Sequence, residues 1–174
     1  GLIRYTANNG SSWATQTTGT TVTIYGLAFG KSQAGWFAGA SGVIGATTNG
    51  GSSWSTQTSG TSSSLYAVCA ADADTAWIVG AAGTVRHTSD GTTWHSLSYG
   101  TVANLNRVEL VSDLNGWVVG AAGMLRLTTD GGITWRTLVS GTSNDLYGVA
   151  FTSASNGVIV GASGLIRSTA NGGT

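Results

Sequence analysis

The sequence has no proline, a single cysteine and few charged residues. One cysteine, Cys69, excludes a disulfide within the chain. Charged residues make up 8% of the sequence, well below the roughly 25% of ordinary globular domains. The net charge is zero, so the chain lacks the basic excess that neutralises nucleic-acid phosphates. No run reaches the roughly 18 apolar residues that predict a membrane-spanning helix. We therefore expect no nucleic-acid partner and no membrane span.

Glycine, serine and threonine take the place of the missing lysine and glutamate. Hydrophobic residues make up 41% of the 174 residues and include seven tryptophans, which is enough for one domain with a substantial core. The absence of proline is typical of well-paired strands. Scarce lysine with abundant threonine, serine and glycine favours an extracellular or cell-envelope location, and we expect that location.

A repeat of 40 or 41 residues runs through the whole chain. The segment that begins at Gly1 returns at Gly42, Gly83, Gly123 and Gly164, in steps of 41, 41, 40 and 41 residues. Two columns of large side chains keep the same period: Trp13, Trp54, Trp94 and Trp135, and then Trp36, Trp77, Trp117 and Val158. The repeats are 1–41, 42–82, 83–122, 123–163 and a partial copy, 164–174, so residues 1–174 form one repeat array.

Each repeat contains four short apolar segments separated by turn residues. In the first, the segments are 24–29, 35–40, 43–47 and 53–58, with turns at 30–34, 41–42 and 49–51. Four strands in each repeat predict an all-β fold, a β-propeller whose blades are sheets of four antiparallel strands. A leucine-rich or β-helical solenoid is the alternative, but such solenoids have shorter repeats with one or two strands each.

The turn between the third and fourth strands carries the sharpest motif. Residues 128–135 read Thr-Thr-Asp-Gly-Gly-Ile-Thr-Trp and match the Asp-box pattern Ser/Thr-x-Asp-x-Gly-x-Thr-Trp. A short Asp or Asn side chain accepts backbone N–H groups inside its own turn, and glycine supplies the positive φ. The tryptophan covers the hairpin and packs between blades. We predict a structural role for the residues of this box: Asn8, Trp13, Asn49, Trp54, Asp90, Trp94, Asp130, Trp135 and Asn171.

The order of motifs in each repeat resembles a known family. Residues 146–151 read Leu-Tyr-Gly-Val-Ala-Phe, residues 156–164 contain Asn-Gly-Val-Ile-Val-Gly-Ala-Ser-Gly, and the box follows in the other copies. This pattern is similar to the photosystem II stability/assembly factor-like propellers, which are relatives of the bacterial neuraminidase repeats. The resemblance implies a ring of about seven blades, of which this chain would be part, and a function in binding other proteins during assembly.

Four arginines share one column of the repeat: Arg4, Arg86, Arg126 and Arg167, with Gly45 at the fifth place. In a ring they would form an arc on one side, and arginine binds carboxylates well through its bidentate guanidinium. The resembled family also carries functional arginine patches. We therefore expect these four residues to bind an acidic partner surface. On this reading, alanine at Arg86 and Arg126 together would weaken partner capture and hardly lower the melting temperature.

The two histidines, His87 and His95, are the candidates for a metal site. If Asp90-Gly91 is a two-residue turn, residue 86 pairs with 95 and residue 87 with 94. Successive residues of a strand point to opposite faces, so His87 and His95 would not share a metal ion. We predict no metal site.

The carboxyl groups do not assemble into a predicted catalytic pair. Glycoside hydrolysis needs two of them flanking the scissile bond. Asp90 and Asp130 belong to turns, Asp72, Asp74 and Asp113 fall in loops, and Glu109 stands alone on a first strand. We expect no enzymatic activity and no cofactor.

The sequence thus predicts a non-catalytic propeller scaffold for protein–protein binding or complex assembly. A structural repeat of a secreted, cell-surface or filament protein is the alternative, and a glycan-binding or glycosidase-related propeller is a lesser one.

The two ends of the chain hold unfinished blades. Residues 1–17 supply a third and a fourth strand, and residues 146–169 supply a first, second and third. Two third strands, at Leu2 and Leu165, would compete for one place in a closed ring. We expect further repeats or another subunit to complete the ends, and the isolated chain not to form a closed, stable monomer.

Overall fold

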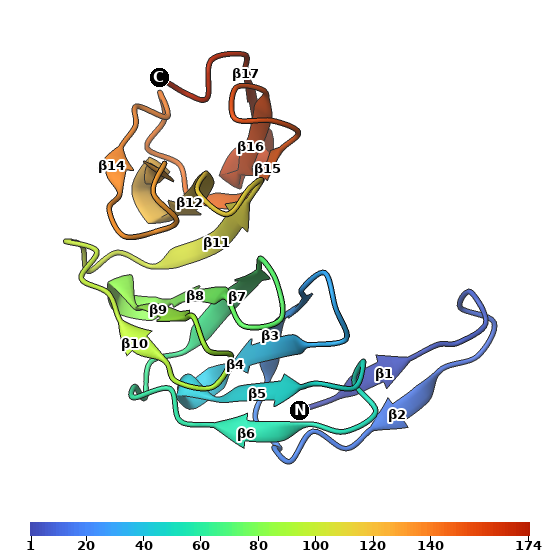
Figure 1. Ribbon diagram of the computed structural model, residues 1–174. Helices are drawn as coiled ribbons and strands as arrows, with labels where there is room; N and C mark the ends of the chain where they lie inside the picture. Colours follow the sequence, from blue (N-terminus) through green and yellow to red (C-terminus); the bar gives the residue numbers. More distant parts are fainter.

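A computed structural model describes all residues, 1–174. The structure is all-β, and its sheets follow one another in chain order (Figure 1). Its only helical segments are four single 3₁₀ turns: η1 (Ala40–Gly42), η2 (Ala81–Gly83), η3 (Ala121–Gly123) and η4 (Ala162–Gly164). No helix of the structure is long or apolar enough to cross a membrane.

Three blades have four strands each. The first blade consists of β3 (Ile24–Phe29), β4 (Gly35–Gly39), β5 (Ile44–Thr47) and β6 (Ser55–Gln57). The second consists of β7 (Leu65–Ala70), β8 (Ala76–Gly80), β9 (Val85–Thr88) and β10 (His95–Ser96). The third consists of β11 (Leu105–Leu110), β12 (Gly116–Gly120), β13 (Leu125–Thr128) and β14 (Arg136–Thr137).

Two smaller sheets flank these blades. An N-terminal pair is formed by β1 (Ile3–Tyr5) and β2 (Ala14–Gln16). The fourth blade has three strands: β15 (Leu146–Phe151), β16 (Gly157–Gly161) and β17 (Leu165–Thr169). The expected third and fourth strands of residues 1–17, and the expected first three strands of residues 146–169, are therefore present. β1 and β17, the two third strands, lie in separate sheets.

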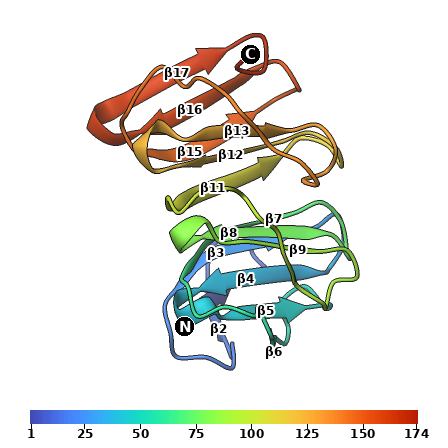
Figure 2. The same ribbon diagram turned by 90° about the vertical axis from the view of Figure 1, so that its left-hand side faces the viewer.

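Every strand pair is antiparallel and joins neighbours in the chain, which confirms the predicted propeller blades and excludes a parallel β-coil. The blades stack face to face (Figure 2), and the first strands of successive blades contact one another. Each blade thus has two ends. One is the 4–1 end, named after the link from the fourth strand of a blade to the first strand of the next. The first and third strands begin there, and it also carries the 3₁₀ turns. The opposite end is the 1–2 end, named after the loop from the first to the second strand of a blade. It also carries the turns between third and fourth strands.

The 3₁₀ turns require glycine because the link to the next blade passes close by. Gly83 has φ +68°, and a Cβ at this position would stand 2.0 Å from the carbonyl oxygen of Thr101. The same contact recurs at Gly42 and Gly123. Only glycine combines this left-handed conformation with so close a backbone. At these three places the glycine that starts a sequence unit therefore fixes the spacing between a blade and the following link.

The core lies between blades rather than within one. Trp36, Trp77 and Trp117 on the second strands are almost completely buried against the next blade. Trp36 and Trp117 donate hydrogen bonds to the carbonyls of Gly91 and Gly172, each 55 residues further along the chain. At these two seams, the packed interfaces between neighbouring blades, one tryptophan thereby buries a large apolar ring and also satisfies its N–H group.

In the turns between third and fourth strands, an Asp or Asn side chain binds its own backbone. Asn49 Oδ1 accepts the Ser53 N–H at 3.0 Å and the Thr47 hydroxyl at 2.9 Å. Asp130 accepts the equivalent bonds from Thr134 and Thr128 at 2.9 and 2.8 Å. The hydroxyl and N–H of Thr134 hold the pKa of Asp130 at about 2, below its ordinary value.

The tryptophans after these turns reach back to the preceding blade. Trp54 Nε1 donates to Gln16 Oε1 at 3.2 Å, and Trp94 Nε1 donates to Gln57 Oε1 at 2.7 Å. In the next blade Leu97 occupies the glutamine position. Trp135, in the third blade, therefore has no glutamine acceptor. Its Nε1 donates instead to the Gly132 carbonyl of its own turn.

The seam between the second and third blades is consequently under-bonded. The Nε1 of Trp77 lies beside Gly132 with no acceptor. Tyr99 replaces the small Thr18, Ser59 and Ser140 of the other repeats, and its buried hydroxyl has no partner either. The buried polar atoms without a partner in this chain, Trp77 Nε1, Tyr99 Oη and Arg126 Nε, all belong to this seam. Such atoms cost stability because they lose water without gaining a bond.

We predict that Leu97→Gln stabilises the protein. The new side chain would offer Trp135 the acceptor that Gln16 and Gln57 offer to its equivalents, and one restored hydrogen bond contributes about 1 kcal/mol. Urea unfolding measures the change. Leu138→Gln is the matched control because Leu138 shares this column but faces no such tryptophan in the structure. The buried Leu138 should lose about 1–3 kcal/mol on this change. Equal destabilisation by both variants would contradict the assignment of the seam.

A second prediction concerns acid. The pKa of Asp130 in the folded state is about 2, below the value of about 3.9 for unfolded aspartate. Its contribution to stability is therefore complete above about pH 4 and is lost as the pH falls towards 2. Asp130→Asn keeps the acceptor oxygen, as Asn49 does, and does not titrate. We expect near-wild-type stability at neutral pH and a smaller loss in acid, measured by urea midpoints at about pH 7 and about pH 2.5. Identical losses in both proteins would refute the prediction.

Candidate protein-binding site

The four arginines of the column lie at equivalent places, on the third strands near the 4–1 end. The direction of their side chains follows from the register. In the second blade Arg86 pairs with Ile78 and Ser96, on the face that carries Val68. Val68 and Ile78 belong to the cluster shared with the first blade. This face therefore points back to the preceding blade, and the guanidinium group points with it.

The Arg86 side chain is buried and binds groups of the protein itself. It is only 8% exposed. Its Nε donates to the Ser59 carbonyl at 2.6 Å, and its Nη2 donates to the Gly60 carbonyl at 3.2 Å. A third donor, Nη1, reaches the Ser96 hydroxyl at 2.9 Å. Burial lowers the pKa of the guanidinium. Arg86 thus connects its blade to the link that leaves the preceding one.

Arg126 repeats this arrangement at the second seam. Its Nη1 donates to the Tyr99 carbonyl, 27 residues earlier, just as Ser59 is 27 residues before Arg86. Its Cζ stands 4.6 Å from the centre of the Tyr99 ring, a distance typical of a cation–π contact. Arg126 is half-buried.

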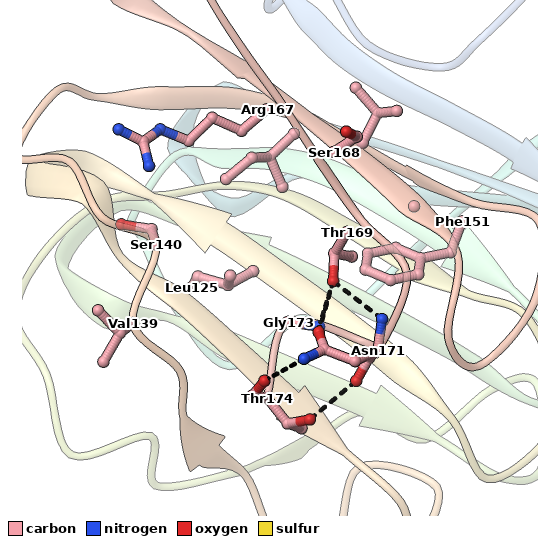
Figure 3. Close-up of a pocket in the computed structure, with 13 residues that line it drawn as sticks. Leu125, Val139, Ser140, Phe151, Arg167, Ser168, Thr169, Asn171, Gly173 and Thr174 are labelled. Atoms are coloured by element: carbon pink, nitrogen blue, oxygen red, sulfur yellow. Dashed lines mark hydrogen bonds between the residues drawn. The ribbon is translucent and has the colours of Figure 1, made fainter.

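Arg4 and Arg167 are exposed. Arg4 donates to the Trp13 carbonyl of its own hairpin at 3.2 Å. Arg167 extends from β17 towards the link of the third blade, near Ser140 (Figure 3). The expected surface arc is therefore wrong for Arg86, because the preceding blade supplies carbonyl acceptors that draw its guanidinium out of solvent. The exposed part of the column is Arg4 and Arg167.

Gly45 breaks the column for a steric reason. Its strand partner in the register is Phe37, where the other blades carry Ile78, Val118 and Ile159. A Cβ at residue 45 would stand 2.1 Å from the Phe37 ring. The larger ring thus fills the space that an arginine stem occupies elsewhere.

A pocket of about 260 Å³ lies between the third and fourth blades (Figure 3). Leu125 and Ile159 line it. Their equivalents at the first seam, Ile44 and Ile78, cluster with Trp94. The pocket therefore lies where Trp94, the tryptophan that follows the turn between third and fourth strands, packs at the first seam. We assign no ligand to this pocket.

The charges of the chain separate between the two ends. The 4–1 end holds five of the seven basic residues, which are the column arginines and Arg107, with one acidic residue, Asp145. The other acidic residues lie towards the 1–2 end: Asp72, Asp74, Asp90, Glu109, Asp113 and Asp130. Lys31 and Arg136 are the basic residues there. The 4–1 end is therefore basic although the net charge of the chain is zero.

The expected register of the histidines was wrong. His95 pairs directly with His87, and Ser96 pairs with Arg86. Six residues, 89–94, separate β9 from β10, and the resulting one-residue shift moves a side chain to the other face. The two histidines share a face, on which the His87 ring packs against Trp77 at 4.5 Å. Burial lowers the pKa of His87. Two imidazoles without a third ligand fall short of a zinc site.

A second column was missed in the sequence, although the period would have revealed it. Tyr25, Tyr66, Asn106 and Tyr147 recur at steps of 41, 40 and 41 residues on the first strands. Each is the extra residue of a bulge in its strand pair.

A family model described as photosynthesis system II assembly factor YCF48 matches residues 5–102, more than half of the chain. The chain belongs to the YCF48 family. This confirms the resemblance noted in the repeats. No curated protein matches the sequence.

Solved structures show the same fold. YCF48 from Cyanidioschyzon merolae matches with a TM-score of 0.76 and 19% identity, over 97% of this chain and 63% of that one. YCF48 bound to D1 peptide matches with a TM-score of 0.69 and 22% identity, over 83% and 48%. The chain thus spans less than two thirds of either relative.

An ancestral GH74 enzyme also shares the fold, with a TM-score of 0.58 and 15% identity over 93% of this chain and 27% of the enzyme. Within the YCF48-type blades, Asp90 and Asp130 bind their own turns, as expected. Asp72 binds its own loop, since its Oδ1 accepts the N–H groups of Asp74 and Thr75. The likeness to the enzyme is one of fold.

We predict that Arg86→Ala destabilises the protein. Its loss would take the guanidinium donors away from the carbonyls of Ser59 and Gly60 and would break the tie between the first two blades. Bonds of this charge-assisted kind contribute about 1.5–3 kcal/mol, so we expect a loss of about 2–3 kcal/mol in urea unfolding. Arg167→Ala, the exposed equivalent, should stay within about 0.5 kcal/mol of the wild type. A wild-type midpoint for Arg86→Ala would show that its bonds contribute nothing.

Proposed function

We propose that this chain is a non-catalytic scaffold that binds an acidic segment of a partner protein at its basic 4–1 end during assembly of a complex. The observation that carries the proposal is the separation of charge between the two ends. A surface of one sign attracts a segment of the opposite sign and speeds its encounter.

Membership of an assembly-factor family supports this function, as does the description of a solved relative as bound to D1 peptide. That description concerns the relative. For this chain, we propose the same class of partner, a peptide segment of an assembling protein. The extracellular or cell-envelope location stays a prediction.

The binding groups must be arginines that the blades leave free. Arg107 and Arg167 are exposed at or near the 4–1 end. Arg4 is exposed too, but its guanidinium donates to the Trp13 carbonyl. Arg86 and Arg126 instead contribute their charge to the local potential while their donors hold backbone carbonyls. We therefore assign direct contacts to the exposed pair and a supporting role to the buried one.

The test compares two double variants that each remove two positive charges. Arg107→Ala with Arg167→Ala should weaken binding of a labelled acidic peptide about three- to tenfold, because exposed ion pairs contribute up to about 1 kcal/mol each. Added salt should narrow this difference. Lys31→Ala with Arg136→Ala, at the 1–2 end, should leave affinity unchanged. Fluorescence anisotropy measures both. Equal weakening by the two double variants would place the binding surface elsewhere.

A further inference from the structure

The tyrosines of the first strands form a row around the inner edge of the blades. Each first strand contains a bulge one residue after its start, where the register shifts between Ile24 and Gly26 and at the three equivalent places. A bulge turns one side chain out of the regular alternation of its strand. The four bulge residues, here called the bulge arc, are Tyr25, Tyr66, Asn106 and Tyr147.

Members of the bulge arc make contacts from one first strand to the next at two of the three seams. The rings of Tyr25 and Tyr66 meet edge to face at 5.6 Å. Asn106 Nδ2 donates to the Leu146 carbonyl of the next first strand at 2.8 Å. These contacts join first strands, which lie against one another from blade to blade and so form the inner edge of the blade stack. The arc therefore follows the inner edge at the 4–1 end.

The aromatic rings of the arc remain open to solvent. Tyr25 is 50% exposed, Tyr147 is 57% exposed and Tyr66 is half-buried. By contrast, Tyr99, which fills a seam, is 4% exposed. A repeated bulge that holds tyrosines at the surface does not serve the core, because the rings bury little area there. Exposed tyrosine combines an apolar ring with a polar hydroxyl, and it is enriched at protein-binding surfaces.

Positive charge adjoins this aromatic surface. Arg107 directly follows the bulge residue Asn106, and it is exposed. The column arginines surround the same end, and Asp145 is the one acidic residue there. An occupant must therefore offer apolar side chains to the rings and carboxylates to the guanidinium groups.

We propose that the bulge arc is the recognition surface for an extended peptide in which an apolar residue is flanked by acidic ones. The peptide runs along the arc, so that its apolar side chain packs against the row of rings to which Tyr66 and Tyr147 belong, and the tyrosine hydroxyls bond the peptide backbone. The flanking carboxylates meet Arg107 and Arg167. This inference rests on the proposed function and adds what that function lacks: the arginines attract any acidic segment, whereas the arc selects among acidic segments by their apolar residue.

The experiment uses a random twelve-residue peptide library displayed on phage and the wild-type chain as bait. Captured peptides should combine Asp or Glu with Leu, Phe or Tyr. The strongest is then synthesised with a fluorescent label, together with a version in which its apolar residue is alanine. Tyr66→Ala and Tyr147→Ala should each weaken binding of the first peptide about tenfold, as truncation of an aromatic anchor does, and should weaken binding of the second much less, because only the backbone contacts remain to be lost. Phenylalanine at the same positions should restore most of the affinity.

Tyr5→Ala provides the matched control because Tyr5 is 49% exposed but lies on β1, outside the arc. Circular dichroism melting of all variants checks that the blades remain folded. If the wild type captures peptides and the tyrosine variants bind like Tyr5→Ala, the arc is refuted and the scaffold function stands. If the Arg107→Ala, Arg167→Ala double variant binds the peptide as tightly as the wild type while the tyrosine variants do not bind it, the proposal that the partner segment is acidic is refuted. A library from which the wild type captures no peptide overturns both proposals.

Discussion

Each blade of this protein is a single sheet, and a single sheet has two faces but no core of its own. Both faces must therefore be covered by neighbours, and the large residues of the second strands show how this is done. Trp36, Trp77 and Trp117 cover one face of a blade and lie against the turn of the next. The glycine-rich turns follow from the same requirement, because the backbone must pass near the ring. Blade spacing, turn geometry and hydrogen bonding all depend on this contact.

The column arginines show that repeated charge in such a fold has two uses. At Arg86 the guanidinium binds the carbonyls of the link that leaves the preceding blade. Where the guanidinium is not held in this way, as at Arg167, it stays in solvent. The stems and donors of buried arginines stabilise the seam while their charge still adds to the potential of one end. An arginine column repeated along a chain therefore does not by itself identify the residues that contact a partner.

The period of the sequence was sufficient to predict the blades. The predicted strand 24–29 coincides with β3, and the predicted 35–40 ends one residue beyond β4. The predicted fourth strand, 53–58, was too long at its start because the turn binds Ser53 to Asn49, and β6 begins at Ser55. The histidine register failed for a related reason, since the turn holds six residues rather than two. Local motifs could not reveal the burial of Arg86, because its acceptors belong to another repeat.

The substitution at Leu97 has a consequence for how such a chain can be cut or rearranged. Leu97 lies in the second blade, while Trp135, the residue that would use a glutamine there, lies 38 residues later in the third. The same distance of 37 or 38 residues separates Gln57 from Trp94 and Gln16 from Trp54. A repeat moved as a 41-residue block would leave half of each such pair behind. The unit that must be kept together is thus the interface between two neighbouring blades, rather than one blade. Among homologues, we expect correlated changes at positions 37 or 38 residues apart. Where the glutamine is replaced, the tryptophan of the next blade should also change its orientation.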